Sequence, residues 1–297
     1  MNATIVLAAC GALFVTPTTR AADSELSALS QQIAKAAREQ PKSFQALDSL
    51  KRRLPELDKR KRGRLAVLTP VLKSMGQEAL LPMLGELLKG AKGPELLPAA
   101  RTAWAASLLE AVAALEDPRG LPVAQRMLAV ETDPDVVRAA ALAVGATGGA
   151  ASAQALADLA RQPGPKQLPV VSALAQCRQL EAAEVLGELL AKHPEEEIAR
   201  VAAKSLGQLA SEWVWEIPTY ASRPDRDAIR SAAAKALVAT FLAYREGEVR
   251  TQAETSLQIV RAAETVSLIE KAKPLASPAD RVQLDRLAAK LAPKPKQ

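Results

Sequence analysis

Apolar residues recur at helical spacing through most of the chain, and one such segment is written more than once. The segment 133–148, DPDVVRAAALAVGATG, opens with a capping aspartate and a proline and closes on glycines, so it predicts one helix. Positions two, four and nine after Val136 hold an arginine, an alanine and a glycine, and the same order follows Ile198. These residues are Arg138, Ala140 and Gly145 in the first copy and Arg200, Ala202 and Gly207 in the second.

Further copies of this segment match less well, but their spacing shows a repeat of roughly regular length. Partial copies begin at Ile229 and Val249, and fainter ones near Leu65, Trp104 and Leu168. Successive starts lie 39, 32, 32, 30, 31 and 20 residues apart, and a second apolar helix follows most of them. A helix–turn–helix unit of this length cannot bury its apolar face alone, whereas stacked units share one core. The pattern predicts an all-α fold, an α-solenoid of stacked helical hairpins.

This pattern resembles the HEAT repeat, in the short form of bacterial HEAT-like proteins of the PBS-lyase type. The likeness rests on 133–148 and 195–207, with partial matches at 229–237 and 249–257, and extends over about residues 64–272. It implies an armadillo-like solenoid with an extended binding face. Two features depart from the pattern. The step from Ile229 to Val249 is too short for a unit, and residues 212–220 replace a second helix with aromatic residues and a proline.

The segments on either side of the array predict caps. Residues 23–63 contain one helix stopped by Pro41 and a second stopped by Pro55, with a basic stretch behind them. Residues 273–297 contain a capping helix over 278–291 and a short tail.

The N-terminus has the pattern of an export signal. In MNATIVLAACGALFVTPTTRAADSE, an apolar run from Ala3 to Val15 precedes a small-residue cleavage site near Ala21 and Ala22. Residues 1–22 are therefore predicted to be a signal peptide, and the mature chain is predicted to be periplasmic or secreted, without a transmembrane span. A basic residue is missing before the apolar run, so a start codon upstream is an alternative. A lipoprotein box ending at Cys10 and a cytoplasmic chain remain alternatives.

Composition supports helices, and charge is concentrated in one place. Hydrophobic residues make up 48% of the chain and aromatic residues 3%, and the formal net charge is +6. Removing the eight bases and two acids of residues 51–64 leaves equal numbers of basic and acidic residues. This stretch is either a patch that contacts anions or a solvated turn between helix ends. Its bases are Lys51, Arg52, Arg53, Lys59, Arg60, Lys61, Arg62 and Arg64.

Catalytic chemistry is weakly represented. The single histidine, His193, is expected to lie at a helix end, and the cysteines, Cys10 and Cys177, form no Cys-x-x-Cys motif. Cys177 is predicted to be a small buried hydrophobe. The chain lacks the repeated His-Glu pairs of the di-iron HEAT-repeat hydroxylases, and no glycine-rich phosphate loop follows a strand. We therefore expect a protein without catalytic residues, metal or cofactor.

The best candidate for partner binding is the aromatic segment 213–220 with the arginines after it. Trp213 and Trp215 are two apart, so on a helix they point about 160–200° from each other, and they cannot both face the core. Exposed Trp, Tyr and Arg are favoured binding anchors, although bulky groups could equally fill a packing defect here. The candidate residues are Trp213, Trp215, Tyr220, Arg223 and Arg226.

Two functions compete on this sequence. The first is a non-catalytic scaffold that binds another protein in the periplasm or cell envelope. The second is a cytoplasmic nucleic-acid-binding protein, similar to the HEAT-like DNA glycosylases, that uses residues 51–64; the neutral balance of the remaining chain counts against it. The repeated arginines, Arg138, Arg200, Arg230 and Arg250, are interpreted as structural partners of carboxylates and carbonyls.

Overall fold

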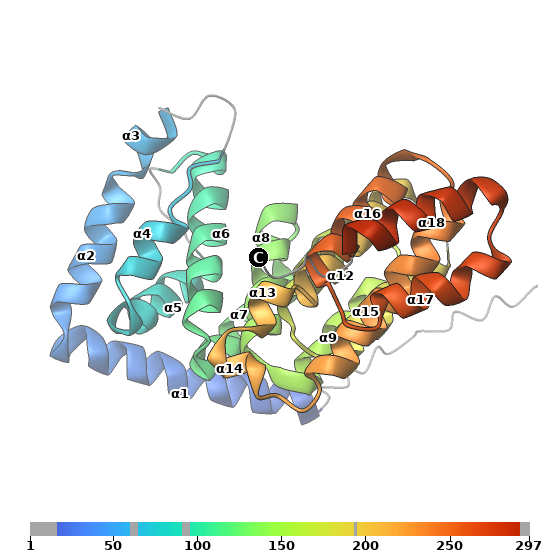
Figure 1. Cartoon of the computed structure of the whole chain (residues 1–297). Coiled ribbons are helices and arrows are strands. Elements are labelled where there is room, and N and C mark those ends of the chain that lie inside the picture. Colours follow the sequence, from blue (N-terminus) through green and yellow to red (C-terminus); the bar gives the residue numbers. More distant parts are fainter. Residues whose placement is uncertain (1–16, 60–64, 91–95, 193–194, 292–297) are drawn as a thin grey trace, which may run out of the picture.

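The computed structural model describes residues 17–59, 65–90, 96–192 and 195–291, and these contain helices and no strand (Figure 1). The predicted all-α class is confirmed in this part of the chain. Local signals start the helices as expected. In α8 (Pro134–Thr147), the Asp133 carboxylate accepts hydrogen bonds from the backbone N–H groups of Asp135 and Val136, at 3.0 and 3.3 Å. Most of the circumference of α8 is buried, from Val136 to Gly145.

The N-terminal helices form one side of the molecule. The long helix α1 (Pro17–Glu39) runs along the lower edge of Figure 1 and packs against α5 (Leu80–Leu88) and α7 (Leu121–Val130). The prediction for Pro41 is confirmed, since α1 ends at Glu39 and Pro41 opens α2 (Pro41–Arg52). The second predicted helix also ends before its proline, since α2 ends at Arg52. Pro55 lies in the first turn of the next helix, α3 (Leu54–Lys59), where the missing N–H of proline costs no helical hydrogen bond.

The remaining helices pack in two layers. Each helix of the first layer contacts the next one in the layer, and most helices of the second layer do the same. The first layer consists of α4 (Thr69–Ser74), α6 (Pro98–Leu115), α8, α10 (Gln167–Ala173) with its 3-10 turn η3 (Leu174–Gln176), α12 (Glu196–Leu209), α16 (Gly247–Val260) and α18 (Pro278–Leu291). The second layer consists of α5, α7, α9 (Gly149–Arg161), α11 (Leu180–Ala191), α15 (Arg226–Ala243) and α17 (Thr265–Ala272).

The repeated glycines lie where first-layer helices approach the next unit most closely. A Cβ atom placed on Gly145 of α8 would lie 2.6 Å from the Sγ of Cys177. A Cβ on Gly207 of α12 would lie 2.6 Å from the Oγ and 3.0 Å from the Cα of Ser256 in α16. These distances are shorter than ordinary van der Waals contact, so a larger residue at 145 must displace the Cys177 side chain, and one at 207 must move the backbone of α16. This packing explains why a glycine stands nine positions into both strong copies.

The interpretation of Ile229 as the start of another copy is wrong. Ile229 belongs to α15, which packs against α11 and α17 in the second layer. The first-layer helix that follows α12 is α16, and it begins the copy at Val249. The 20-residue step therefore leads from a second-layer helix to a first-layer helix. Residues 211–225, which we call the insert, separate the two helices of the unit α12–α15.

Candidate functional site

The insert contains two one-turn helices, α13 (Glu212–Trp215) and α14 (Pro218–Ala221), which place its tryptophans in opposite environments. The Trp215 side chain is 1% exposed, and its indole N–H donates to the carbonyl of Leu209 at 2.9 Å. The Trp213 side chain is 73% exposed. The prediction that these side chains cannot share one face is confirmed. Trp215 is a core residue, so Trp213 alone of the pair is available to a partner.

Tyr220 holds the insert against a distant helix. Its hydroxyl donates to the Oε1 atom of Glu116 at 2.9 Å, and Glu116 directly follows α6, 104 residues earlier in the chain. Its ring packs edge-on against Trp215, with 6.0 Å between the ring centroids. Burial raises the pKa of Tyr220, and the hydrogen bond to the Glu116 carboxylate raises it further, because the carboxylate favours the protonated phenol. The Tyr220 hydroxyl therefore stays a donor at neutral pH.

The two arginines of the candidate site have different positions. The guanidinium of Arg223 lies 5.6 Å from the centroid of the Trp215 ring and pairs with Asp225, with 2.9 Å between its Nε and the Oδ1 atom. The hydrogen bonds from Arg223 lower the pKa of the Asp225 carboxyl. Arg226 pairs instead with Asp227 at 2.9 Å and does not line the pocket described below. The structure thus brings Tyr220 and Arg223 together and leaves Arg226 apart.

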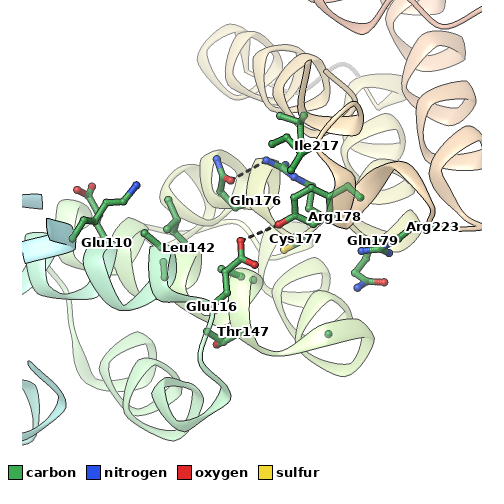
Figure 2. Close-up of a pocket in the computed structure, with 18 of the residues that line it drawn as sticks. Glu110, Glu116, Leu142, Thr147, Gln176, Cys177, Arg178, Gln179, Ile217 and Arg223 are labelled. Carbon is green, nitrogen blue, oxygen red and sulfur yellow. Dashed lines mark hydrogen bonds between the residues drawn. The ribbon is translucent and has the colours of Figure 1, made fainter. Parts of the chain in front are cut away.

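A pocket of about 510 Å³ lies between the insert and the first layer. We call it the insert pocket. Its walls come from α4, α6, α8, the turn before α11, and the insert, which supplies Val214, Ile217, Tyr220 and Arg223. In Figure 2, Glu110 and Leu142 lie at one end and Arg178 and Arg223 at the other. The sequence did not indicate most of this lining, which includes Glu110, Glu116, Leu142, Ala146, Gln176 and Arg178.

Two residues of this pocket have strained backbones. Glu116 has φ of 50° and Arg178 has φ of 49°, in the left-handed region that residues with a Cβ seldom adopt. Such strain persists only where surrounding contacts hold it, and it concentrates at functional sites. The Arg178 guanidinium donates to the carbonyl of Ala175 and to the Oε1 of Gln176, and the latter distance is 3.1 Å. Burial lowers the pKa of Arg178, although the charges of nearby groups oppose this effect.

Cys177 lines the insert pocket but is not a reactive thiol. It is 3% exposed, and burial raises the pKa of its thiol to about 12, against a smaller opposing effect of the Arg178 charge. A thiol with this pKa is protonated at neutral pH and is a poor nucleophile. The predicted role of Cys177 as a small buried hydrophobe is confirmed.

We expect native Cys177 to resist modification by DTNB at pH 8, because its thiol is both buried and protonated. A chain with Cys10→Ala would isolate this residue. Absorbance at 412 nm should stay flat in buffer and rise by one thiol equivalent after unfolding in urea. The same chain with Cys177→Ala gives the blank. Rapid labelling of the folded Cys10→Ala chain would contradict the buried environment.

Only half of the basic stretch falls within the described residues. Lys51 pairs with Glu86, and Arg52 pairs with Asp48 at 2.6 Å, whereas Arg53 and Lys59 are exposed. The Lys51 pair is largely shielded from solvent, whereas the Arg52 side chain is exposed and its charge stays accessible. Arg60, Lys61, Arg62 and Arg64 lie outside the described residues, as does His193.

The repeated arginines have the predicted structural partners. The Nη2 atom of Arg138 lies 2.7 Å from Glu110, and the Nε atom of Arg200 lies 3.4 Å from Glu248. Arg230 donates to the carbonyl of Val260 at 2.7 Å. Arg250 pairs with Asp280 at 3.2 Å, and its guanidinium lies 4.0 Å from the centroid of the Phe241 ring. The contacts of Arg138, Arg230 and Arg250 tie neighbouring helices together, whereas the Arg200 contact is loose and exposed to solvent.

Within residues 17–59, 65–90, 96–192 and 195–291, His, Cys, Asp and Glu side chains form no group of three that could hold a metal ion. No helix in the same ranges has the length and apolar character needed to cross a bilayer. No protein-family model matches the chain and no curated protein matches its sequence, so the case for a function rests on the geometry of the insert pocket.

Proposed function

We propose that the chain is a non-catalytic scaffold that binds another protein, built as an α-solenoid of HEAT-like repeats. The observation that carries this proposal is a pair of exposed apolar side chains on the insert, one of which, Ile217, lines the insert pocket. Trp213 is 73% exposed and Ile217 is 46% exposed. Ile217 also lines the pocket, together with Val214. Large apolar side chains held at the edge of a cavity are typical anchors of a protein interface.

The two-layer packing supports the solenoid part of the proposal. Each first-layer helix contacts its successor, and the repeated glycines and arginines lie at these contacts, as expected for stacked repeats. Such a stack presents its first-layer helices as a continuous face. The insert covers part of that face and converts it into a pocket.

The chemistry of the insert pocket supports a binding role over a catalytic one. Glu110 accepts hydrogen bonds from Thr69 at 2.6 Å and from Arg138 at 2.7 Å, so both of its oxygens are committed. Glu116 is held by Tyr220, and the thiol of Cys177 is protonated at neutral pH. The groups that could act as base or nucleophile are thus engaged in structure. The nucleic-acid alternative has less support, because Lys51 is paired with Glu86 and the chain outside residues 51–64 has equal numbers of basic and acidic residues.

We expect Ile217→Asp to weaken peptide binding at the insert pocket. The full-length chain would be used to select binders from a phage-displayed library of random 12-residue peptides, and the most enriched peptide would be labelled with fluorescein. Anisotropy should show at least a tenfold weaker affinity for the variant, about the loss of one interface anchor. Ile217 precedes α14 as its N-cap, a position that favours aspartate, so the fold should persist.

The matched control is Val282→Asp, since Val282 is 50% exposed on α18 and does not line the insert pocket. This variant should bind the labelled peptide as the parent does. Equal affinity of the Ile217→Asp and Val282→Asp variants would refute docking at the insert pocket. Failure to select any peptide would also count against a peptide-binding scaffold.

We further propose that the scaffold works in the periplasm or cell envelope, on the strength of the apolar run and small residues at the N-terminus. Expression of the untagged chain in a bacterial host should yield a periplasmic species whose intact mass corresponds to cleavage near Ala21 or Ala22. A cytoplasmic species that keeps Met1 would overturn export.

A further inference from the structure

A second pocket continues from the insert pocket along the first layer. Its volume is about 480 Å³, and it lies among α8, α10 and α12. Leu142 and Gln176 line both pockets, so the two adjoin. We call this second pocket the basic pocket, because its lining includes Arg138, Arg200 and Lys204 and no carboxylate.

The cations of the basic pocket are unequally neutralised. The Nη2 atom of Arg138 contacts Glu110 at 2.7 Å, and most of the five N–H donors of the guanidinium are not used by this contact. Arg200 has a loose contact of 3.4 Å with Glu248, whose side chain is 78% exposed. Solvent weakens an ion pair of this kind to a small fraction of its Coulomb energy. Lys204 has no carboxylate within 4.0 Å among the described residues.

The uncharged lining of the basic pocket also offers donors. The Oε1 atom of Gln176 already accepts from Arg178 at 3.1 Å, so the N–H groups of its amide are what remain for a ligand. Ser172 and Gln208 add a hydroxyl and a further amide. A site with three cations, several N–H and O–H donors and no carboxylate is complementary to an anion.

The two adjoining pockets therefore differ in chemistry. The insert pocket combines apolar walls at Leu142, Ala146, Val214 and Ile217 with charged side chains of both signs, whereas every charged side chain of the basic pocket is a cation. We propose that the two pockets together bind an extended acidic segment of a partner protein. An apolar side chain enters the insert pocket, and an aspartate or glutamate a few residues away pairs with Lys204 and Arg200. This inference rests on the proposed binding function, and it further specifies that the bound segment of the partner is acidic.

A peptide fits this site better than a nucleic acid does. Nucleic-acid grooves track a long phosphate backbone with many cations and stack bases on aromatic rings. The basic pocket supplies three cations in a confined space and has no aromatic side chain in its lining. One or two carboxylates of a protein segment match that number of cations.

The peptide selection described above tests the inference when the selected sequences are compared. Peptides enriched on the full-length chain should carry Asp or Glu within a few residues of a large apolar residue. The labelled peptide should bind Lys204→Glu about tenfold more weakly than the parent, and its affinity for the parent should fall as salt rises. Lys235→Glu is the matched control, since Lys235 is likewise an exposed lysine inside a long helix, on α15 of the second layer.

The outcomes separate this inference from the proposed function. The selected peptides could be apolar without being acidic, bind Lys204→Glu as tightly as the parent, and bind Ile217→Asp more weakly. That result would overturn the acidic partner but would still support the scaffold. Peptides that ignore both substitutions would overturn both proposals. A labelled dT12 oligonucleotide that binds the parent as tightly as the peptide and is lost in Lys204→Glu would overturn the peptide in favour of nucleic acid.

Discussion

Replacing Trp215 with alanine is expected to lower the free energy of unfolding by about 3–5 kcal/mol, as for other large aromatic residues removed from cores. The side chain is 1% exposed, packs against Tyr220 and Arg223, and donates a hydrogen bond to the carbonyl of Leu209. The substitution would leave a cavity and an unpaired carbonyl under the insert. Urea unfolding followed by circular dichroism would measure the change.

Trp213→Ala is the matched control for this experiment, because the two tryptophans are two residues apart in the same short helix. Its side chain is 73% exposed, so the free energy of unfolding should change by no more than about 0.5 kcal/mol. Equal effects of the two substitutions would contradict the assignment of one tryptophan to the core and the other to solvent. A binding test with Trp215→Ala would be uninformative, since it would combine lost stability with lost contact.

Gly207→Ala is expected to destabilise the chain although alanine is the better helix former. The helix propensity gained is about 1 kcal/mol. Overpacking costs about 1–3 kcal/mol, and the upper half of that range applies because the new Cβ would lie 3.0 Å from the Cα of Ser256, which only a shift of α16 can relieve. Thermal unfolding should therefore show a lower midpoint for the variant than for the parent.

Two companion variants make this expectation specific. Gly187→Ala is the matched glycine in α11, where the new Cβ would meet only the Cβ of Ala236 at 3.1 Å, so its unfolding midpoint should change little. Adding Ser256→Gly to Gly207→Ala removes the nearest side-chain atoms, so the two changes together should cost less than the sum of their separate effects. Strict additivity would show that the side-chain atoms of Ser256 are not the cause and would leave the contact with its Cα as the source of the strain.

Much of the fold could be predicted from the sequence because its signals are local. Caps such as Asp133, the period of buried residues in α8, and the glycines at 145 and 207 each act within one helix or between adjacent helices. The layer to which a helix belongs is not a local property. Ile229 has the spacing of a first-layer helix, and only the packing of α15 against α11 and α17 shows that it lies in the second layer.

The candidate site could be predicted only in outline. The spacing of Trp213 and Trp215 indicated that they face opposite ways, and the packing of Trp215 decides which one is buried. The left-handed backbone of Glu116 and Arg178 could not be predicted, because only a glycine would have signalled a positive φ in the sequence. The bond between Glu116 and Tyr220 joins positions 104 residues apart, beyond the reach of any periodic pattern.

That bond has a mechanical consequence. Tyr220 fastens the insert to the end of α6, and both Tyr220 and Glu116 line the insert pocket. Any motion that lifts the insert away from α6 and opens the pocket there must first break this hydrogen bond. The bond therefore acts as a latch that favours the closed form of the pocket.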